Sequence, residues 1–257
     1  MIDYKNSIVL IGSVGAGKSL VSRALAAKLG LQVITTDEFR HLPKMDEILK
    51  TLSDPYLPPR IKDEYIRYQH LRSKYPSIRN YSDFGFNPES SKYLERNFGK
   101  IAWHYYQKQF ENLLIQDICA NIQGAVILDT GGGMPISLDQ EYAELRNKFE
   151  NINSSLFHRE FKHIDMISKA ITSDIYSKFE HIVYLKMPDS IIDRSDRAQD
   201  DYIGKKFIES GDYDKIATDV VDTTGLYVDG KPQHNVLDTI TNNIIDIASN
   251  SIDIMEE

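Results

Sequence analysis

Short apolar runs alternate with longer amphipathic stretches along this chain, a pattern typical of parallel α/β proteins. The apolar runs predict strands, and stretches whose apolar residues recur about every 3.6 positions predict helices at 18–29, 99–121 and 236–247. Because strands and helices alternate, we expect a three-layer α/β fold with a central parallel sheet and right-handed crossovers. The predicted strands are Ile8–Ile11, Leu31–Thr35, Ala125–Asp129, His181–Lys186 and Asp219–Asp222.

Three polar stretches interrupt this alternation. Residues 41–97 contain prolines that divide the segment into short helical pieces, so we expect a helical insertion beside the core. Residues 137–178 form a second polar insertion of helical character, and residues 189–214 are rich in charge. We expect residues 1–257 to form a single domain that carries both insertions, and a chain of this length can bury a substantial core.

A glycine-rich segment lies between the first predicted strand and the first predicted helix. Its sequence, GSVGAGKS, matches the pattern G-x-x-x-x-G-K-[ST] in full. Glycines let successive N–H groups turn inward around a polyphosphate, and the following helix adds the positive end of its dipole. The segment therefore predicts a phosphate-binding loop, with a chance glycine-rich turn as the alternative. The expected nucleotide-binding residues are Gly12, Ser13, Val14, Gly15, Ala16, Gly17, Lys18, Ser19 and Leu20.

Three polar residues have predicted roles at the phosphates. Lys18 is expected to reach the β- and γ-phosphates of ATP, and the Ser19 hydroxyl to bind Mg²⁺. Asp129 closes the third predicted strand, and sites in open α/β sheets lie at the carboxyl ends of the strands. We therefore expect Asp129 to bind Mg²⁺ or a water on it, with a purely structural role as the alternative.

Other residues at strand ends are candidates for the substrate side. Asp37 follows the second predicted strand, where it would hydrogen-bond to a substrate hydroxyl or accept its proton, and the alternative is a helix N-cap before Glu38. Gly131, Gly132 and Gly133 come just after Asp129 and would let the backbone approach a ligand closely; a flexible turn is the alternative.

Composition narrows the classes of partner and the location. The chain has 30 basic and 38 acidic side chains and a net charge of −8, which disfavours nucleic acid or an anionic membrane as the main partner. No apolar run approaches a membrane span, and the first residues lack the apolar region of a signal peptide. The single cysteine, Cys119, excludes an internal disulfide framework. We expect a cytosolic protein and leave its oligomeric state open.

Taken in order, the motifs resemble those of the shikimate kinase family. They are GSVGAGKSLVSRALAAKLGL, TTDEF, ILDTGGG, a charged segment and YDKIATDVVDTT. The resemblance covers roughly residues 7–38, 98–134 and 181 to the end. It implies a P-loop kinase fold like that of nucleoside-monophosphate kinases, with a mobile lid, and transfer of the γ-phosphoryl group of ATP to a hydroxyl of shikimate.

The resemblance also implies roles for individual residues. Asp37 corresponds to the aspartate that binds the substrate hydroxyl, and Gly131–Gly133 to the glycine turn on the substrate side. The charged segment 189–214 corresponds to the lid, in which Arg194 or Arg197 would neutralise phosphate charge in the transition state.

Three positions depart from the family pattern, all on the substrate side. Thr35 replaces a strand-end acid, His104 stands in place of the carboxylate-binding arginine, and Glu209 aligns near a second substrate arginine. An arginine holds a carboxylate through paired, charge-assisted bonds, which a histidine that binds anions only when protonated does not reproduce. We therefore favour an acceptor other than shikimate, such as a sugar, a polyol, a nucleoside or a protein hydroxyl.

Two functions remain at this point. The favoured one is an ATP- and Mg²⁺-dependent kinase that acts on a small hydroxyl-bearing substrate. The alternative is a nucleotide-dependent binding or switch protein that hydrolyses ATP slowly and acts on a protein partner through its inserted helices. Release of ADP that depends on an acceptor would distinguish the kinase from the switch.

Overall fold

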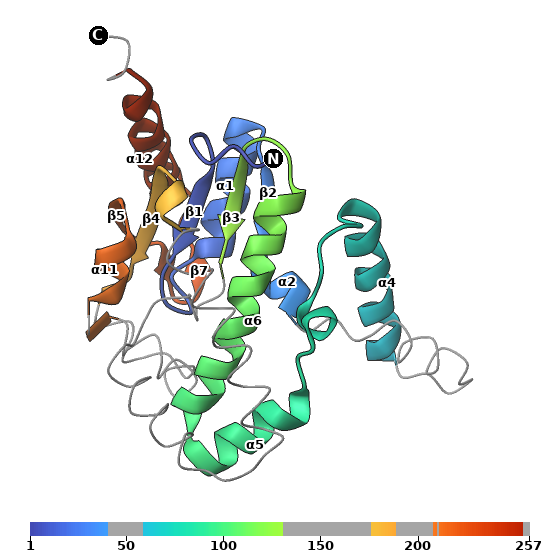
Figure 1. The fold of residues 1–257 in the computed structure, drawn as a ribbon. Helices are drawn as coiled ribbons and strands as arrows, with labels where there is room; N and C mark the ends of the chain where they lie inside the picture. The colour runs from blue at the N-terminus through green and yellow to red at the C-terminus, as the bar shows by residue number, and fades with distance from the viewer. Residues whose placement is uncertain (41–58, 131–175, 189–207, 210, 254–257) are drawn as a thin grey trace.

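A computed structural model describes residues 1–40, 59–130, 176–188, 208–209 and 211–253. Its strands are β1 (Ile8–Ile11), β2 (Gln32–Thr35), β3 (Val126–Asp129), β4 (His181–Lys186) and β5 (Asp219–Asp222). All of these strands pair in parallel, in the order β2-β3-β1-β4-β5 (Figure 1). The predicted α/β fold with a central parallel sheet is therefore confirmed.

Helices cover both faces of this sheet and complete three layers (Figure 1). The main covering helices are α1 (Lys18–Leu29), α6 (Lys100–Asn121) and α12 (His234–Asp253). Alternate side chains of β1 point to opposite faces: Ile8 and Leu10 pack with α1 and α12, whereas Val9 and Ile11 pack on the side of α6. Because both faces are buried, the strand reads as an unbroken apolar run in the sequence.

The ends of the covering helices follow local signals where the sequence contains them. Helix α1 stops at Gly30, which adopts a left-handed φ of 67° and donates its N–H to the Ala26 carbonyl at 2.9 Å, as expected of a helix-stop glycine. Helix α12 is longer than the predicted 236–247. The apolar period fades after Ala248, but the chain contains no glycine or proline there to end the helix.

The described part of 41–97 forms further helices. They are α4 (Pro59–Lys74), the 3₁₀ helix η1 (Tyr81–Phe84) and α5 (Pro88–Phe98). Aromatic rings join this region to α6: the ring centroid of Phe86 lies 5.3 Å from that of Phe110 and 5.6 Å from that of Tyr106. The division into a core, two insertions and a lid stays a prediction, because much of 41–97, 137–178 and 189–214 lies outside the described residues.

Several short elements complete the described chain. They are α2 (Thr36–Arg40), the 3₁₀ helix η2 (Tyr176–Lys178), α11 (Asp212–Ile216), and the antiparallel pair β6 (Tyr227–Val228) and β7 (Lys231–Pro232). The β6–β7 hairpin was not predicted from the sequence. Its turn is Asp229-Gly230, with φ of 49° and 73°, and an Asp-Gly pair is a typical two-residue hairpin turn.

The aromatic cluster on α6 predicts a large stability effect. Phe110 is fully buried, so Phe110→Ala should lower the free energy of unfolding by about 3–5 kcal/mol, measured by urea denaturation. As a control, Tyr93→Ala on α5 removes a ring that is 45% exposed and should cost no more than about 1 kcal/mol. Equal losses for the two variants would contradict this description of the core.

Candidate functional site

The phosphate loop connects β1 to α1 and needs glycine at two positions. Gly12 has a φ of 144°, and a Cβ atom there would lie 2.7 Å from the Leu185 carbonyl oxygen of β4. Gly17 has a φ of 86°, and a Cβ atom there would lie 2.5 Å from the Leu226 side chain. The loop is thus held between β4 and the segment before β6 at a distance that only glycine permits.

Lys18 is the first residue of α1 and is buried inside the loop. Its ammonium donates to the carbonyl oxygens of Gly12, at 2.7 Å, and Ser13, at 2.9 Å. The first turn of α1 contains no acidic residue of its own, and the positive end of the helix dipole faces the loop. The hydroxyl of Ser13 is also buried and has no hydrogen-bond partner among the residues that the structure describes. A cationic, donor-rich cradle of this kind fits a polyphosphate.

Asp129 is the last residue of β3 and lies beside the loop. In the sheet register it pairs with Leu10 of β1 and with Thr35 of β2, so its carboxylate emerges at the carboxyl edge of the sheet. It accepts hydrogen bonds from the hydroxyls of Ser19 and Thr35, the latter at 3.4 Å. The predicted pair of metal-binding residues, Ser19 and Asp129, is thereby brought together.

Burial raises the pKa of the Asp129 carboxyl above its usual value, and the negative charge of Asp37 raises it further. Hydrogen bonds from Ser19 and Thr35 and the charge of Lys18 oppose this rise only in part. A buried carboxylate with a raised pKa gains from a nearby divalent cation, because the cation offsets the cost of its charge.

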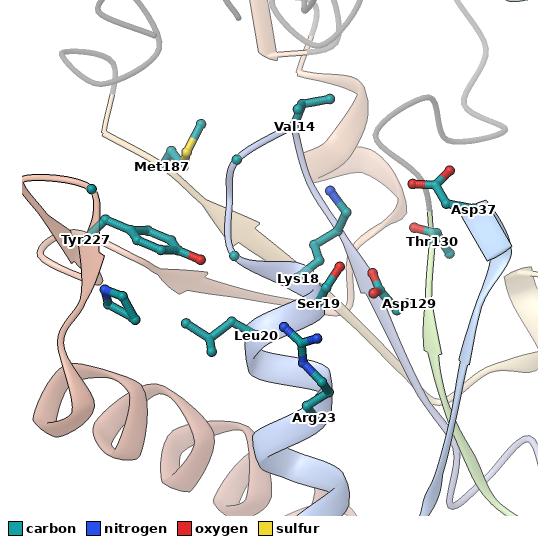
Figure 2. A pocket seen from close by; sticks show the side chains of 14 residues that line it. Val14, Lys18, Ser19, Leu20, Arg23, Asp37, Asp129, Thr130, Met187 and Tyr227 are labelled. Atoms are coloured by element: carbon teal, nitrogen blue, oxygen red, sulfur yellow. The ribbon is translucent and has the colours of Figure 1, made fainter. Parts of the chain in front are cut away.

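Asp37 lies on the other side of Asp129, on the short helix α2. It is the second residue of that helix, so it is not the N-cap that the sequence also allowed. Its side chain is exposed and lines the same pocket as Lys18, Ser19 and Asp129. Thr130 lies next to Asp37 (Figure 2), and its hydroxyl donates a hydrogen bond to the Leu10 carbonyl oxygen at 2.8 Å.

These side chains share one pocket of about 870 Å³. Figure 2 shows Asp37 and Thr130 on one side, Tyr227 and Met187 on the opposite side, and Lys18, Ser19 and Asp129 between them. The pocket is lined by Val14, Gly15, Gly17, Lys18, Ser19, Leu20, Arg23, Asp37, Asp129, Thr130, Met187, Tyr227, Gly230 and Pro232.

Sequence reasoning missed the wall that the β6–β7 hairpin contributes. Tyr227, Gly230 and Pro232 come from the hairpin, and Arg23 comes from the exposed side of α1 (Figure 2). The Asp229-Gly230 turn was a usable signal for the hairpin. No local signal shows that this hairpin folds back against the phosphate loop.

Apart from Asp37, His104 is the predicted substrate-side or lid residue that the structure describes. His104 lies on α6, is 4% exposed and does not line the pocket. Gly131, Gly132, Gly133, Arg194 and Arg197 lie outside the described residues.

A divalent ion in this pocket would depend on phosphate oxygens. Within the described ranges, no group of three or more His, Cys, Asp or Glu residues is placed to hold a metal ion. Mg²⁺ commonly uses one or two protein oxygens together with phosphate oxygens and waters. Ser19 and Asp129 fit that mode of binding.

Among the described helices, none is long and apolar enough to cross a bilayer.

Comparisons with known proteins found matches only among solved structures. No protein-family model and no curated protein matches the chain. Shikimate kinase from Aquifex aeolicus matches with 14% identity and a TM-score of 0.41, covering 98% of this chain and 99% of that chain. Shikimate kinase from Bacteroides thetaiotaomicron matches with 11% identity and a TM-score of 0.44, covering 95% and 98%. Shikimate kinase from Acinetobacter baumannii, in complex with shikimate, matches with 15% identity and a TM-score of 0.41, covering 95% and 94%.

The class of the protein rests on the chain's own geometry. A complete phosphate loop follows β1, helices cover both faces of a parallel sheet, and a carboxylate ends the neighbouring strand β3. The chain therefore has a P-loop α/β fold of the kind that its resemblance to shikimate kinases implied.

The raised pKa of Asp129 predicts an unusual response to its removal. The folded protein binds the Asp129 proton more tightly than the unfolded chain does, so ionisation of this group costs stability as pH rises above the ordinary value of 3.8. Asp129→Asn should therefore raise the thermal unfolding midpoint of the metal-free protein at pH 7. The gain should shrink as the pH falls towards 4.

Asp222→Asn is the matched control, at the end of the edge strand β5. Hydrogen bonds from the Thr224 hydroxyl and N–H lower the pKa of Asp222, so its ionised form favours the folded state at neutral pH. This variant should lower the unfolding midpoint at pH 7. A lower midpoint for Asp129→Asn as well would contradict the proposed cost of the buried charge.

Proposed function

We propose that this protein is an ATP- and Mg²⁺-dependent kinase that transfers the γ-phosphoryl group to a hydroxyl of a small molecule. The observation that carries the proposal is the order of groups across one pocket: the phosphate loop, the Ser19–Asp129 pair and the exposed Asp37 carboxylate. Phosphoryl transfer needs mainly positioning and charge stabilisation, and this order provides a place for each participant.

The phosphate end of the pocket supports the nucleotide part of the proposal. Lys18 would exchange its two carbonyl partners for β- and γ-phosphate oxygens, while the N–H groups of the loop donate to the same phosphates. Ser19 and Asp129 would hold Mg²⁺, which when bound neutralises charge on the phosphates. Arg194 and Arg197 are proposed to close over the nucleotide, as the family resemblance implies.

The hairpin side of the pocket supports a place for the nucleotide base. Tyr227 and Pro232 offer apolar surfaces there, next to Leu20, and Arg23 offers a cation (Figure 2). Aromatic rings and guanidinium groups are the usual surfaces on which bases stack. We therefore propose that the base lies between α1 and the hairpin, with the triphosphate directed towards Asp129.

The acceptor is proposed to bind beside Asp37. Its exposed carboxylate would accept a hydrogen bond from the attacking hydroxyl and orient it, as expected for a base or positioning group in phosphoryl transfer. Gly131–Gly133 are proposed to line the same side.

The charge distribution of the pocket supports a neutral acceptor. Among the described residues that line the pocket, the only cations are Lys18 and Arg23, and both belong to α1 on the nucleotide side. A carboxylate-bearing acceptor such as shikimate would need a cation beside Asp37. We therefore propose a sugar, a polyol or a nucleoside as the acceptor class. We also propose that the protein is cytosolic.

ADP release tests this proposal. Mg-ATP is incubated with shikimate, with sugars and polyols, or with nucleosides, and ADP is measured over time. We expect stimulation by a neutral polyhydroxyl acceptor, and a loss of roughly 10²- to 10³-fold for Lys18→Ala because the main cation at the phosphates is gone. Asp37→Asn should lose acceptor-stimulated release while keeping its affinity for ATP.

Two outcomes would count against the kinase. Turnover that is slow, sensitive to Lys18→Ala and indifferent to every acceptor would favour the nucleotide-dependent switch. Turnover unchanged in Lys18→Ala would mean that the loop is not the nucleotide site. Stimulation by shikimate would instead keep the kinase and overturn the neutral-acceptor class.

A further inference from the structure

A buried carboxylate lies outside the pocket and contacts the residue that precedes Asp37 in the chain. Glu111 belongs to α6 and is 1% exposed. The hydroxyl of Thr36, which is also 1% exposed, donates to its Oε1 at 3.1 Å. This hydrogen bond joins two elements that are 75 positions apart in the sequence.

Burying Glu111 is expensive, so its presence calls for a reason. A carboxylate in a protein interior costs free energy unless hydrogen bonds compensate it, and an apolar residue of similar size is often as stable or more stable there. Nearby, burial raises the pKa of the Tyr176 phenol well above its usual value, and the charge of Glu111 adds to that effect. Stability alone therefore does not account for a carboxylate at this position.

The partner of Glu111 is next to the proposed acceptor-orienting residue. Thr36 is the first residue of α2, immediately after β2, and Asp37 is the second. A helix of five residues is too short to hold its own orientation, so α2 depends on contacts with its surroundings. One such contact is Phe39, which is 1% exposed and packs edge-on against Tyr75 at 5.7 Å.

Thr36 supplies a directional contact at the other end of α2. Packing of Phe39 resists removal of the helix from the core, but apolar contacts are not directional and do not fix its rotation. A hydrogen bond is directional, and the burial of both Thr36 and Glu111 shields this one from water. One peptide unit separates that bond from the residue that lines the pocket.

We infer that Glu111 is a positioning residue: through its hydrogen bond to Thr36 it fixes the junction of β2 and α2, so that the Asp37 carboxylate faces the acceptor side of the pocket. This inference rests on the proposed kinase function. It adds a residue on α6 that touches neither ATP nor acceptor and yet controls the rate of transfer.

Thr36→Val tests the inference, because valine keeps the shape of threonine and removes the donor. The probe is Mg-ATP with the neutral acceptor that stimulates ADP release most. We expect turnover to fall about tenfold to a hundredfold, since small displacements of a reacting group are costly, while the dissociation constant for ADP changes less than about twofold. Thr36→Ser, which keeps the hydroxyl, should restore turnover to within about threefold, and Glu111→Ala should reproduce the loss.

A double-mutant cycle separates positioning from general damage. In an Asp37→Asn background, Thr36→Val should cause no further loss, because the group that it positions is already inactive. Thr241→Val is the matched control: Thr241 is fully buried on α12 and donates to the Leu237 carbonyl oxygen at 3.0 Å, away from Asp37. It should lower stability without changing turnover per folded molecule.

The outcomes distinguish this inference from the proposed function. If Lys18→Ala and Asp37→Asn lose turnover but Thr36→Val does not, or if its loss adds fully to that of Asp37→Asn, the positioning role of Glu111 is overturned and the kinase stands. If Asp37→Asn has no effect, the role proposed for Asp37 fails and the inference fails with it.

Discussion

The parallel register of β1, β3 and β2 brings Asp129, Thr130 and Asp37, on the proposed acceptor and metal side, to one edge of the sheet. Asp129 pairs with Leu10 on one side and with Thr35 on the other, so the three strands end at one level. From that level the chain continues into the phosphate loop, into Thr130 and into α2 respectively. A shift of β3 by one residue would turn Asp129 towards the opposite face of the sheet, away from Ser19.

The site contains charged groups in buried positions, where a charge costs the most free energy. Asp129 is buried, and the pKa of its carboxyl is raised. Glu111 is buried on α6, where it accepts a hydrogen bond from Thr36, the residue before Asp37. Opposing them, Lys18 lies in the loop with its ammonium bound to backbone carbonyls. The carboxylates are thus preorganised for the proposed function, in which Lys18 would still have to exchange its carbonyl partners for phosphate oxygens.

Local patterns were sufficient to predict the core of this fold. The strands and α1 were predicted correctly because β1 is a continuous apolar run, the other strands contain shorter apolar runs, and α1 is a periodic stretch bounded by glycine. The loop and Asp129 followed from their position at strand ends. The hydrogen bond from Thr36 to Glu111 was beyond such reasoning, because it joins two helices that are distant in sequence and a buried glutamate in an amphipathic helix looks like any surface glutamate. The contact of the hairpin with Gly17 is non-local in the same way.

A residue that keeps its place in a motif need not line the pocket that the described residues form. His104 occupies the position at which the resembling family has a carboxylate-binding arginine, yet it is buried on α6 and does not line the pocket. Its neighbour one turn along the same face, Gln107, is also buried. This face of α6 therefore packs as part of the core, and Glu111 continues it towards α2. If α6 acts on the acceptor through Thr36 and Asp37 instead of touching it, recognition depends on orienting a hydroxyl, which suits a neutral acceptor better than an anionic one.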